Sequence, residues 1–411
     1  MRLRTPLLLS LFCAIGAATT IACSGPSEPA AAGTGESNVN SDSDIFAKPE
    51  AFSVKISAPF STLFTRLKAN QADPPDADAE AGAVAHEAEY SEAGQLVFTQ
   101  EGADKVLDMR VYVRGESSRG DCPFPKLKIE FSDKEQLKKT PFKGHSKIRL
   151  NTHCGPGDAS ARSGMGRVMN GVGPVREELT YRLIRAAGIP TYRTRVIQIH
   201  YDDRADQTQT DTFGMLMEVG DDAAQRFQKM DPPLIPKEAV YLDPNQAWNG
   251  RITPENTAQI AVAEAFSGNK DWGGTHNIDS FGVPQASEMF QIAQDFDLGA
   301  IVLGDIARYW KGSAPVSDAQ PSLTNPAVAK LLLANKSAMN AAYVEAEKAA
   351  IASKAIASED GRTTTDPGFL EAQKRIKALF DLPALQAAPA DADAGASDAA
   401  ADATDAGADA Q

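Results

Sequence analysis

Apolar and polar residues alternate along much of the chain between about residues 95 and 220. The alternation is clearest in Met109–Val113, Leu127–Phe131 and Ile148–Leu150, and it returns in Val196–Tyr201 and Phe213–Val219. A period of two residues is typical of strands with one buried face. We therefore predict an antiparallel sheet in this part of the chain.

A helical spacing of apolar residues replaces the alternation at two places. Arg176–Ala187 has this spacing and is flanked by Pro174 and Gly188, which are common at the two ends of a helix. Farther on, Thr257–Phe266 and the long segment Ala327–Ile356 have the same character. The pattern predicts an α+β protein in which a sheet with one main helix is followed by a mostly helical half.

The beginning of the chain has the layout of a secretion signal. Arg2 and Arg4 precede the apolar stretch Pro6–Ala18, and small residues lead to Cys23. The Ile-Ala-Cys ending resembles the cleavage site of bacterial lipoproteins, and this resemblance implies a lipid on Cys23. Cleavage by an ordinary signal peptidase, which would leave Cys23 free, is the alternative. We predict an extracytoplasmic protein anchored to a bacterial membrane, with the outer membrane or the cell surface favoured.

Composition divides the remainder of the chain. Residues 1–22 are the predicted signal peptide, and residues 23–44, rich in small and acidic residues, are the predicted flexible tether. Residues 386–411 repeat Ala and Asp and form a predicted disordered tail. Between them we expect a sheet-rich lobe at 45–220 and a helical lobe at 221–385. The net charge of −14 argues against general nucleic-acid binding, which requires clustered Lys and Arg.

The cysteines fit an oxidising compartment. Cys13 would leave with the signal peptide and Cys23 would carry the lipid, so that Cys122 and Cys154 remain. Two remaining cysteines around a strand-rich segment predict a disulfide between them.

Two polar segments stand out in the second half of the chain. The first is a Gly-containing loop, Gly268–Asn277, and the second, Phe290–Asp297, is an apolar strand that ends in two carboxylates. A hairpin would bring oxygen atoms of Asp271, Asn277 and Asp295 around one divalent cation. Mg²⁺ prefers oxygen ligands and is usually held by one or two carboxylates together with substrate phosphates.

The order of these segments resembles the spore-coat protein H (CotH) family of atypical protein kinases. The resemblance runs from about Met109 to Gly299 and implies a bilobal, protein-kinase-like fold with an antiparallel sheet lobe. The matching segments are Arg114-Gly115-Glu-Ser117, Lys126–Phe131, the helix from Arg176 to Gly188, the strand Arg195–Tyr201, Phe213-Gly214 through Glu218, Gly268–Asn277 and Asp295-Phe296-Asp297.

The resemblance also implies roles for individual residues. Asp271 would be the catalytic residue, and Asn277 and Asp295 would bind Mg²⁺. A strand lysine, Lys126 or Lys128, would contact the ATP phosphates and would be oriented by Glu177 or Glu178. Glu218 would lie at the hinge that binds adenine. The alternation of strand residues does not choose between the two lysines, and we favour Lys128 and Glu178.

Two features depart from the kinase pattern. Asp271 and Asn277 lie one position farther apart than in the protein-kinase catalytic loop. A Gly-rich segment, residues 154–173, is inserted between a strand and its helix, where such a loop can cradle phosphate. Its spacing fits neither a Walker motif nor a dinucleotide fingerprint, so we favour a flexible insert. Without the resemblance, Asp271 and Asn277 would be ordinary turn formers, and the two lysines would lie on a solvated strand face.

Three functions follow from these observations. The first is Mg–ATP-dependent phosphorylation of Ser or Thr in an exported protein. ATP is scarce outside the cytoplasm, which favours the second, a non-catalytic surface protein for adhesion or binding. The third comes from Asp295-Phe-Asp297, which resembles the Asp-x-Asp site of metal-dependent glycosyltransferases and phosphatases. That site requires a preceding parallel α/β pattern, which the alternating strands do not predict.

Overall fold

The computed structural model describes the central part of the chain. The described residues are 44–48, 50–70, 91–158, 160–242, 250–269, 277–284, 286–304 and 314–387. The predicted signal peptide, Cys23, the tether before Asp44 and the tail from residue 388 lie outside them. Asp271 lies outside them as well.

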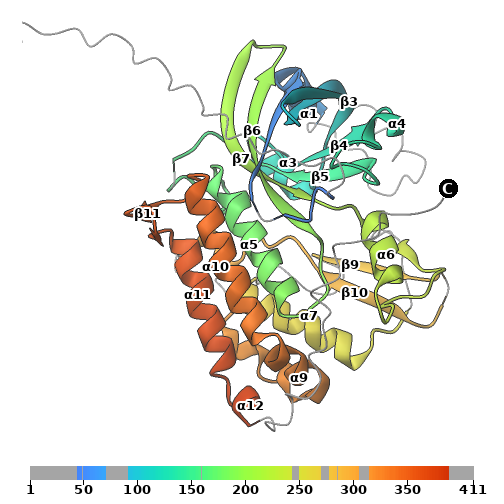
Figure 1. Cartoon of the computed structure of the whole chain (residues 1–411), viewed down its shortest axis with the longest axis vertical. Helices are drawn as coiled ribbons and strands as arrows, with labels where there is room; N and C mark the ends of the chain where they lie inside the picture. The colour runs from blue at the N-terminus through green and yellow to red at the C-terminus, as the bar shows by residue number, and fades with distance from the viewer. Residues whose placement is uncertain are drawn as a thin grey trace, which may run out of the picture. The chain divides into compact units, whose positions relative to one another are not determined.

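Seven strands close into a barrel in the order β1-β2-β3-β4-β5-β7-β6 (Figure 1). Each neighbouring pair is antiparallel except β1 and β6, which run parallel and complete the ring. The strands are β1 Phe52–Ala58, β2 Ser91–Gln100, β3 Ala103–Val113, β4 Leu127–Phe131, β5 Lys147–Asn151, β6 Thr194–Asp203 and β7 Thr208–Met217.

Alternate residues of the strands fill the barrel. Leu96 lies opposite Leu107, and Ile129 lies opposite Ile148; all four side chains are buried. Phe142, from the loop before β5, joins this core. The burial of the four strand residues shows that the apolar half of the predicted alternation faces inward. Three short helices accompany the barrel: α1 Phe60–Asn70, α3 Glu116–Asp121 and α4 Lys134–Leu137.

The predicted bilobal, kinase-like fold with an antiparallel sheet lobe is wrong. The sequence analysis identified most of the strands but not β1, although Phe52, Val54 and Ile56 alternate with Ser53 and Lys55 as in the other strands. β1 pairs with β2 on one side and with β6 on the other, so that the sheet has no free edge. The sheet is therefore a closed barrel with one parallel pair.

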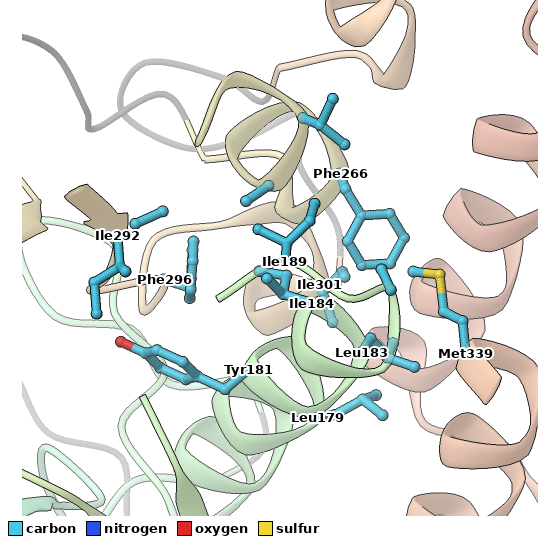
Figure 2. Close-up of a cluster of buried hydrophobic side chains, with 14 of the residues drawn as sticks. Leu179, Tyr181, Leu183, Ile184, Ile189, Phe266, Ile292, Phe296, Ile301 and Met339 are labelled. Atoms are coloured by element: carbon cyan, nitrogen blue, oxygen red, sulfur yellow. The ribbon is translucent and has the colours of Figure 1, made fainter. Parts of the chain in front are cut away.

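A second hydrophobic core is built mainly from helices, with contributions from strands such as β9 (Ile278–Gly282) and β10 (Met289–Ala293), and α5, Val172–Ala186, belongs to it. The prediction placed this helix with the sheet, but its buried residues Leu179, Leu183 and Ile184 pack with Phe266 and Met339 (Figure 2). α5 lies beside α10 (Figure 1). The other elements of this half are α6 Gly220–Lys229, α7 Pro254–Ser267, α8 Ala300–Leu303, η1 Val316–Ala319, η2 Ser322–Thr324, α9 Pro326–Ala334, α10 Lys336–Ala352, β11 Ser358–Glu359, β12 Thr363–Thr364, α11 Pro367–Phe380 and α12 Pro383–Gln386.

The predicted long helical segment after Ala327 is two helices, α9 and α10, which meet at Asn335. A buried ion pair ties α5 to the helix that follows them: Arg176 Nη2 lies 2.8 Å from Asp366 Oδ2, and Asp366 is also the N-cap of α11. None of the helices in the described part of the chain is both long enough and apolar enough to cross a membrane.

A small antiparallel sheet and one helix frame the second polar segment. The sheet has the order β10-β9-β8, with β8 Val240–Leu242, β9 Ile278–Gly282 and β10 Met289–Ala293. α7 starts at the N-cap Thr253, whose side chain accepts from the Asn256 N–H, and ends at Gly268 in the left-handed conformation. A Cβ at residue 268 would lie 2.3 Å from the Cβ of Ala300, so glycine is required there for space as well as for its backbone angle.

Cys122 and Cys154 form the predicted disulfide, which links residues 32 positions apart. The bond joins the end of α3 to the beginning of the segment 154–173. This segment, which we call the insert, has internal contacts: Arg162 and Val168 form a β-bridge, and the Gly157 N–H donates to the Met169 carbonyl at 2.7 Å.

We expect the variants Cys122→Ala, Cys154→Ala and the double variant to lose the same free energy of unfolding, about 3–4 kcal/mol, because each removes one cross-link of this loop length. Urea unfolding of the four oxidised proteins measures this. Unchanged stability in all three variants, or a double variant that loses the sum of two separate effects, would contradict the assignment.

Candidate active site

Lys126 is the centre of a cluster of charged side chains between the barrel and the end of β10. It directly precedes β4, and its carbonyl accepts from the Arg114 N–H at 2.9 Å. Its ammonium group forms ion pairs with Asp295 and with Asp297, the latter at 2.9 Å. The Lys126 side chain is only 9% exposed. Burial alone lowers the pKa of Lys126, but the two carboxylates outweigh burial and raise it, so the lysine stays charged.

Asp297 is held in place by a second cation. Arg167, from the insert, donates through Nε to Asp297 Oδ2 at 2.7 Å. The same guanidinium group also contacts Asp121 at 2.9 Å and the Ser117 hydroxyl at 2.8 Å. Burial raises the pKa of Asp297, but Lys126 and Arg167 overcome this effect and lower it to about 2. Asp297 is therefore a fixed anion that anchors both the lysine and the insert.

Glu177 of α5 contributes a third carboxylate to the interior of the cluster. Both of its oxygens accept from the Asn151 side-chain amide, at 2.9 and 2.8 Å, and Asn151 in turn accepts from Arg114. Burial raises the pKa of Glu177 to about 7, although Lys126 acts in the opposite direction. Near neutral pH this residue is thus divided between its charged and neutral forms.

Asp295 has a different environment because its side chain is 31% exposed. Its backbone is in the left-handed region, with φ of 58°, and its N–H donates to the Tyr181 hydroxyl at 2.9 Å. Figure 2 shows Tyr181 of α5 beside Phe296, with ring centroids 4.9 Å apart. Tyr181 therefore fixes the turn that presents Asp295. Non-glycine residues with positive φ are uncommon, although Asn and Asp are enriched among them.

Asn277 lies at the same end of the β9–β10 hairpin. Its carbonyl accepts from the Gln294 N–H at 2.9 Å, and its φ is 56°. Two left-handed residues, Asn277 and Asp295, therefore flank one end of the hairpin, and their role as metal ligands stays a prediction.

The structure separates the other predicted site residues from this cluster. Lys128 lies over the ring of Tyr112, with its Nζ 4.6 Å from the centroid. Glu178 is buried and paired with Arg182 at 2.8 Å. Glu218 is fully buried and accepts from Arg193 and Arg226. Sequence analysis favoured Lys128 and Glu178, whereas in the structure Lys126 and Glu177 are the lysine and glutamate that line one cavity. Asp271 is outside the described residues.

Sequence reasoning gave no role to Arg167 or Arg114, and it gave Asp297 a role only in the Asp-x-Asp alternative. Arg167 lies in the insert, which we interpreted only as a flexible segment. Asp297 belongs to the Asp295-Phe296-Asp297 motif, and this motif was the sequence feature that could have identified it as a site residue. Arg114 was likewise part of a quoted segment, but nothing in its spacing indicated a contact with Asn151.

The space beside Lys126 is small. A cavity of about 20 Å³ is lined by Lys126, Arg167, Glu177 and Asp297, together with the disulfide. This volume is enough for about one water molecule. Within the described residues, no group of three or more His, Cys, Asp or Glu side chains is arranged to hold a metal ion. Any larger ligand must therefore approach from the exposed side of Asp295.

Comparison with models of known protein families and with curated protein sequences found no match for this chain. The resemblance described above therefore stays a prediction.

The pKa of Glu177 leads to a prediction about stability. A folded-state pKa of about 7, above the ordinary value of 4.5, means that the folded protein holds this proton more tightly than the unfolded chain does. The contribution of Glu177 to the free energy of unfolding is fully present below about pH 4.5 and is lost as pH rises through 7, by on the order of 3 kcal/mol. Glu177→Gln should remove this part of the pH dependence.

Urea unfolding between pH 4.5 and 8 provides the test, with Glu255→Gln on the exposed surface of α7 as the matched control. The difference between wild type and Glu177→Gln should change with pH, whereas the difference for the control should stay constant. Parallel stability curves for wild type and Glu177→Gln would show that the pKa of Glu177 is not raised.

Proposed function

We propose that this chain is a phosphotransferase that uses Mg–ATP to phosphorylate Ser or Thr in an exported protein. We further propose that it acts outside the cytoplasm, anchored to the membrane by a lipid on Cys23. The observation that carries the proposal is the ion pair between the buried Lys126 and the partly exposed Asp295. Phosphoryl transfer depends on such a combination, because the protein must position and neutralise a highly charged triphosphate.

The donor set fits Mg²⁺ of the kind that is bound together with a nucleotide. Such an ion needs one or two carboxylates, and the remaining positions are taken by phosphates and water. Asp295 offers an exposed carboxylate, and Asn277 lies at the same hairpin end, so these two residues would hold the ion. When bound, Mg²⁺ would supply positive charge against the phosphate oxygens.

The residues of the chain itself have distinct roles in this proposal. Lys126 would act as a positive point charge toward the phosphates. Asp297 would not bind ligand, because Lys126 and Arg167 already occupy it; it would keep the lysine in place. Glu177, adjacent in the interior, would adjust the charge of the cluster by taking up or releasing a proton.

One observation favours a second candidate, a non-catalytic surface binding protein. The cavity beside Lys126 holds about 20 Å³, far less than the ~300 Å³ of a typical ligand pocket. If the cluster serves only to join the barrel to β10, the protein would bind no nucleotide. The Asp-x-Asp transferase has less support, because Asp295 follows an antiparallel hairpin rather than a strand of a parallel sheet.

Calorimetric titration with ATP distinguishes these candidates. We expect binding that requires Mg²⁺ and that weakens by about tenfold or more in Asp295→Asn, since this change removes the exposed carboxylate. Asp206→Asn, the same change in an exposed turn, should bind like wild type.

The outcomes separate the candidates cleanly. Absence of ATP binding both with and without Mg²⁺ would refute the phosphotransferase and support the binding protein. Preference for a nucleotide sugar over ATP would support the Asp-x-Asp transferase. If ATP binds, radioactive phosphate transfer to a mixture of Ser- and Thr-containing peptides tests whether the protein turns over.

A further inference from the structure

A second and larger cavity, of about 400 Å³, lies away from the Lys126 cluster and shares no lining residue with it. Its walls are the first described residues of the chain, the loop before β5, the residue preceding β6 and the helix α6. The volume is in the range of pockets that bind small molecules. Its lining is mainly charged, and this charge indicates the class of ligand.

Cationic side chains predominate around this cavity. They are Lys143, His145, Arg193, Arg226 and Lys229. Burial by itself lowers the pKa of His145, but hydrogen bonds to Asp222 and Asp44 raise it to about 9, so the imidazole is charged at neutral pH. The opposing carboxylates are Asp44 and Asp222 at the wall and Glu218 behind it. Five cations and three anions leave an excess of positive charge, on a chain whose net charge is −14.

Glu218 gives the two arginines fixed positions. It is fully buried, and its oxygens accept from Arg193 Nε at 3.0 Å and from Arg226 Nε at 3.3 Å. Among the described residues, Nη2 of Arg193 and Nη1 of Arg226 have no hydrogen-bond acceptor. A guanidinium group that is already fixed loses little freedom when it binds an anion, and its fork matches carboxylate and phosphate oxygens.

The chain itself shows that this cavity accepts a carboxylate. Asp44 Oδ2 lies 2.7 Å from Arg193 Nη1, and Asp44 Oδ1 lies 3.4 Å from His145 Nε2. Lys143 and Lys229 are exposed at the same cavity and have no ion-pair partner among the described residues. Carboxylates thus partly neutralise Arg193 and His145, whereas Lys143 and Lys229 have no ion pair among the described residues.

We propose that this cavity is a binding site for a small polyanion carrying phosphate or carboxylate groups, with Arg193, Arg226 and His145 at its base and Lys143 and Lys229 at its mouth. The site is separate from the one proposed for ATP. Each cation contributes attraction that is strongest at low ionic strength, so the affinity should fall as salt is added.

Calorimetric titration with pyrophosphate in EDTA, and separately with citrate, tests the proposal. Wild type should bind at least one of the two with one-to-one stoichiometry. The variant Lys143→Gln/Lys229→Gln removes both mouth cations without touching a buried contact, and its affinity should fall by about tenfold or more. Lys330→Gln/Lys348→Gln makes the same change of net charge on exposed helix positions outside the cavity and should bind like wild type.

Asp295→Asn separates this site from the proposed nucleotide site. Binding of pyrophosphate or citrate that persists in Asp295→Asn while Mg²⁺-dependent ATP binding is weakened would support two independent sites. The proposal is overturned if neither anion binds at millimolar concentration, if both lysine double variants weaken binding equally, or if Asp295→Asn abolishes binding of the anion.

Discussion

The ammonium group of Lys126, held between Asp295 and Asp297, is the contact on which the rest of this structure depends. A buried charge without a partner costs several kcal/mol, and a buried pair is strongly destabilised when one partner is removed. Lys126 adjoins a barrel strand and the two carboxylates follow β10. These ion pairs join the barrel to the β9–β10 hairpin, and removal of either carboxylate would leave the buried ammonium group with one partner fewer.

α5 connects the charged cluster to the helical half of the protein. Within one helix, Glu177 faces the charged cluster, Tyr181 accepts from the Asp295 N–H, and Arg176 pairs with the N-cap of α11. The remaining buried residues of α5 fill the helical core. The insert completes the arrangement from the other side, since Arg167 reaches Asp297 and the disulfide fixes the beginning of the insert beside α3. The cluster thus lies where the barrel, the helical core and the insert meet.

The sequence predicted those parts of the fold in which the hydrophobic pattern is strong. Strands β3 to β7, the helix α5 and the Cys122–Cys154 pair were all identifiable from spacing and composition. Closure of the barrel was not, because it depends on β1 and on its parallel pairing with β6, a long-range contact that leaves no local signal. The position of one short strand therefore decided the fold class.

Single site residues were hard to choose for a related reason. Lys126 lies just outside the paired ladder of β4, so the alternation that relates it to Lys128 no longer applies. Glu177 and Glu178 are both buried, and a helical pattern does not distinguish two neighbours that are both covered. Arg167 comes from an insert whose Gly-rich composition gave no hint of an ion pair. For Asp295 and Asn277 the structure shows only that the β9–β10 hairpin places both at one end, and their role as metal ligands stays a prediction.

A double-mutant cycle on Lys126→Met and Asp297→Asn measures the central contact directly through the free energy of unfolding. If the ammonium group of Lys126 depends on Asp297, the double variant should be more stable than the sum of the two single effects predicts, by about 2 kcal/mol or more. Effects that add within about 0.5 kcal/mol would show that the two residues are energetically independent. The charged cluster would then not be what joins the barrel to the β9–β10 hairpin.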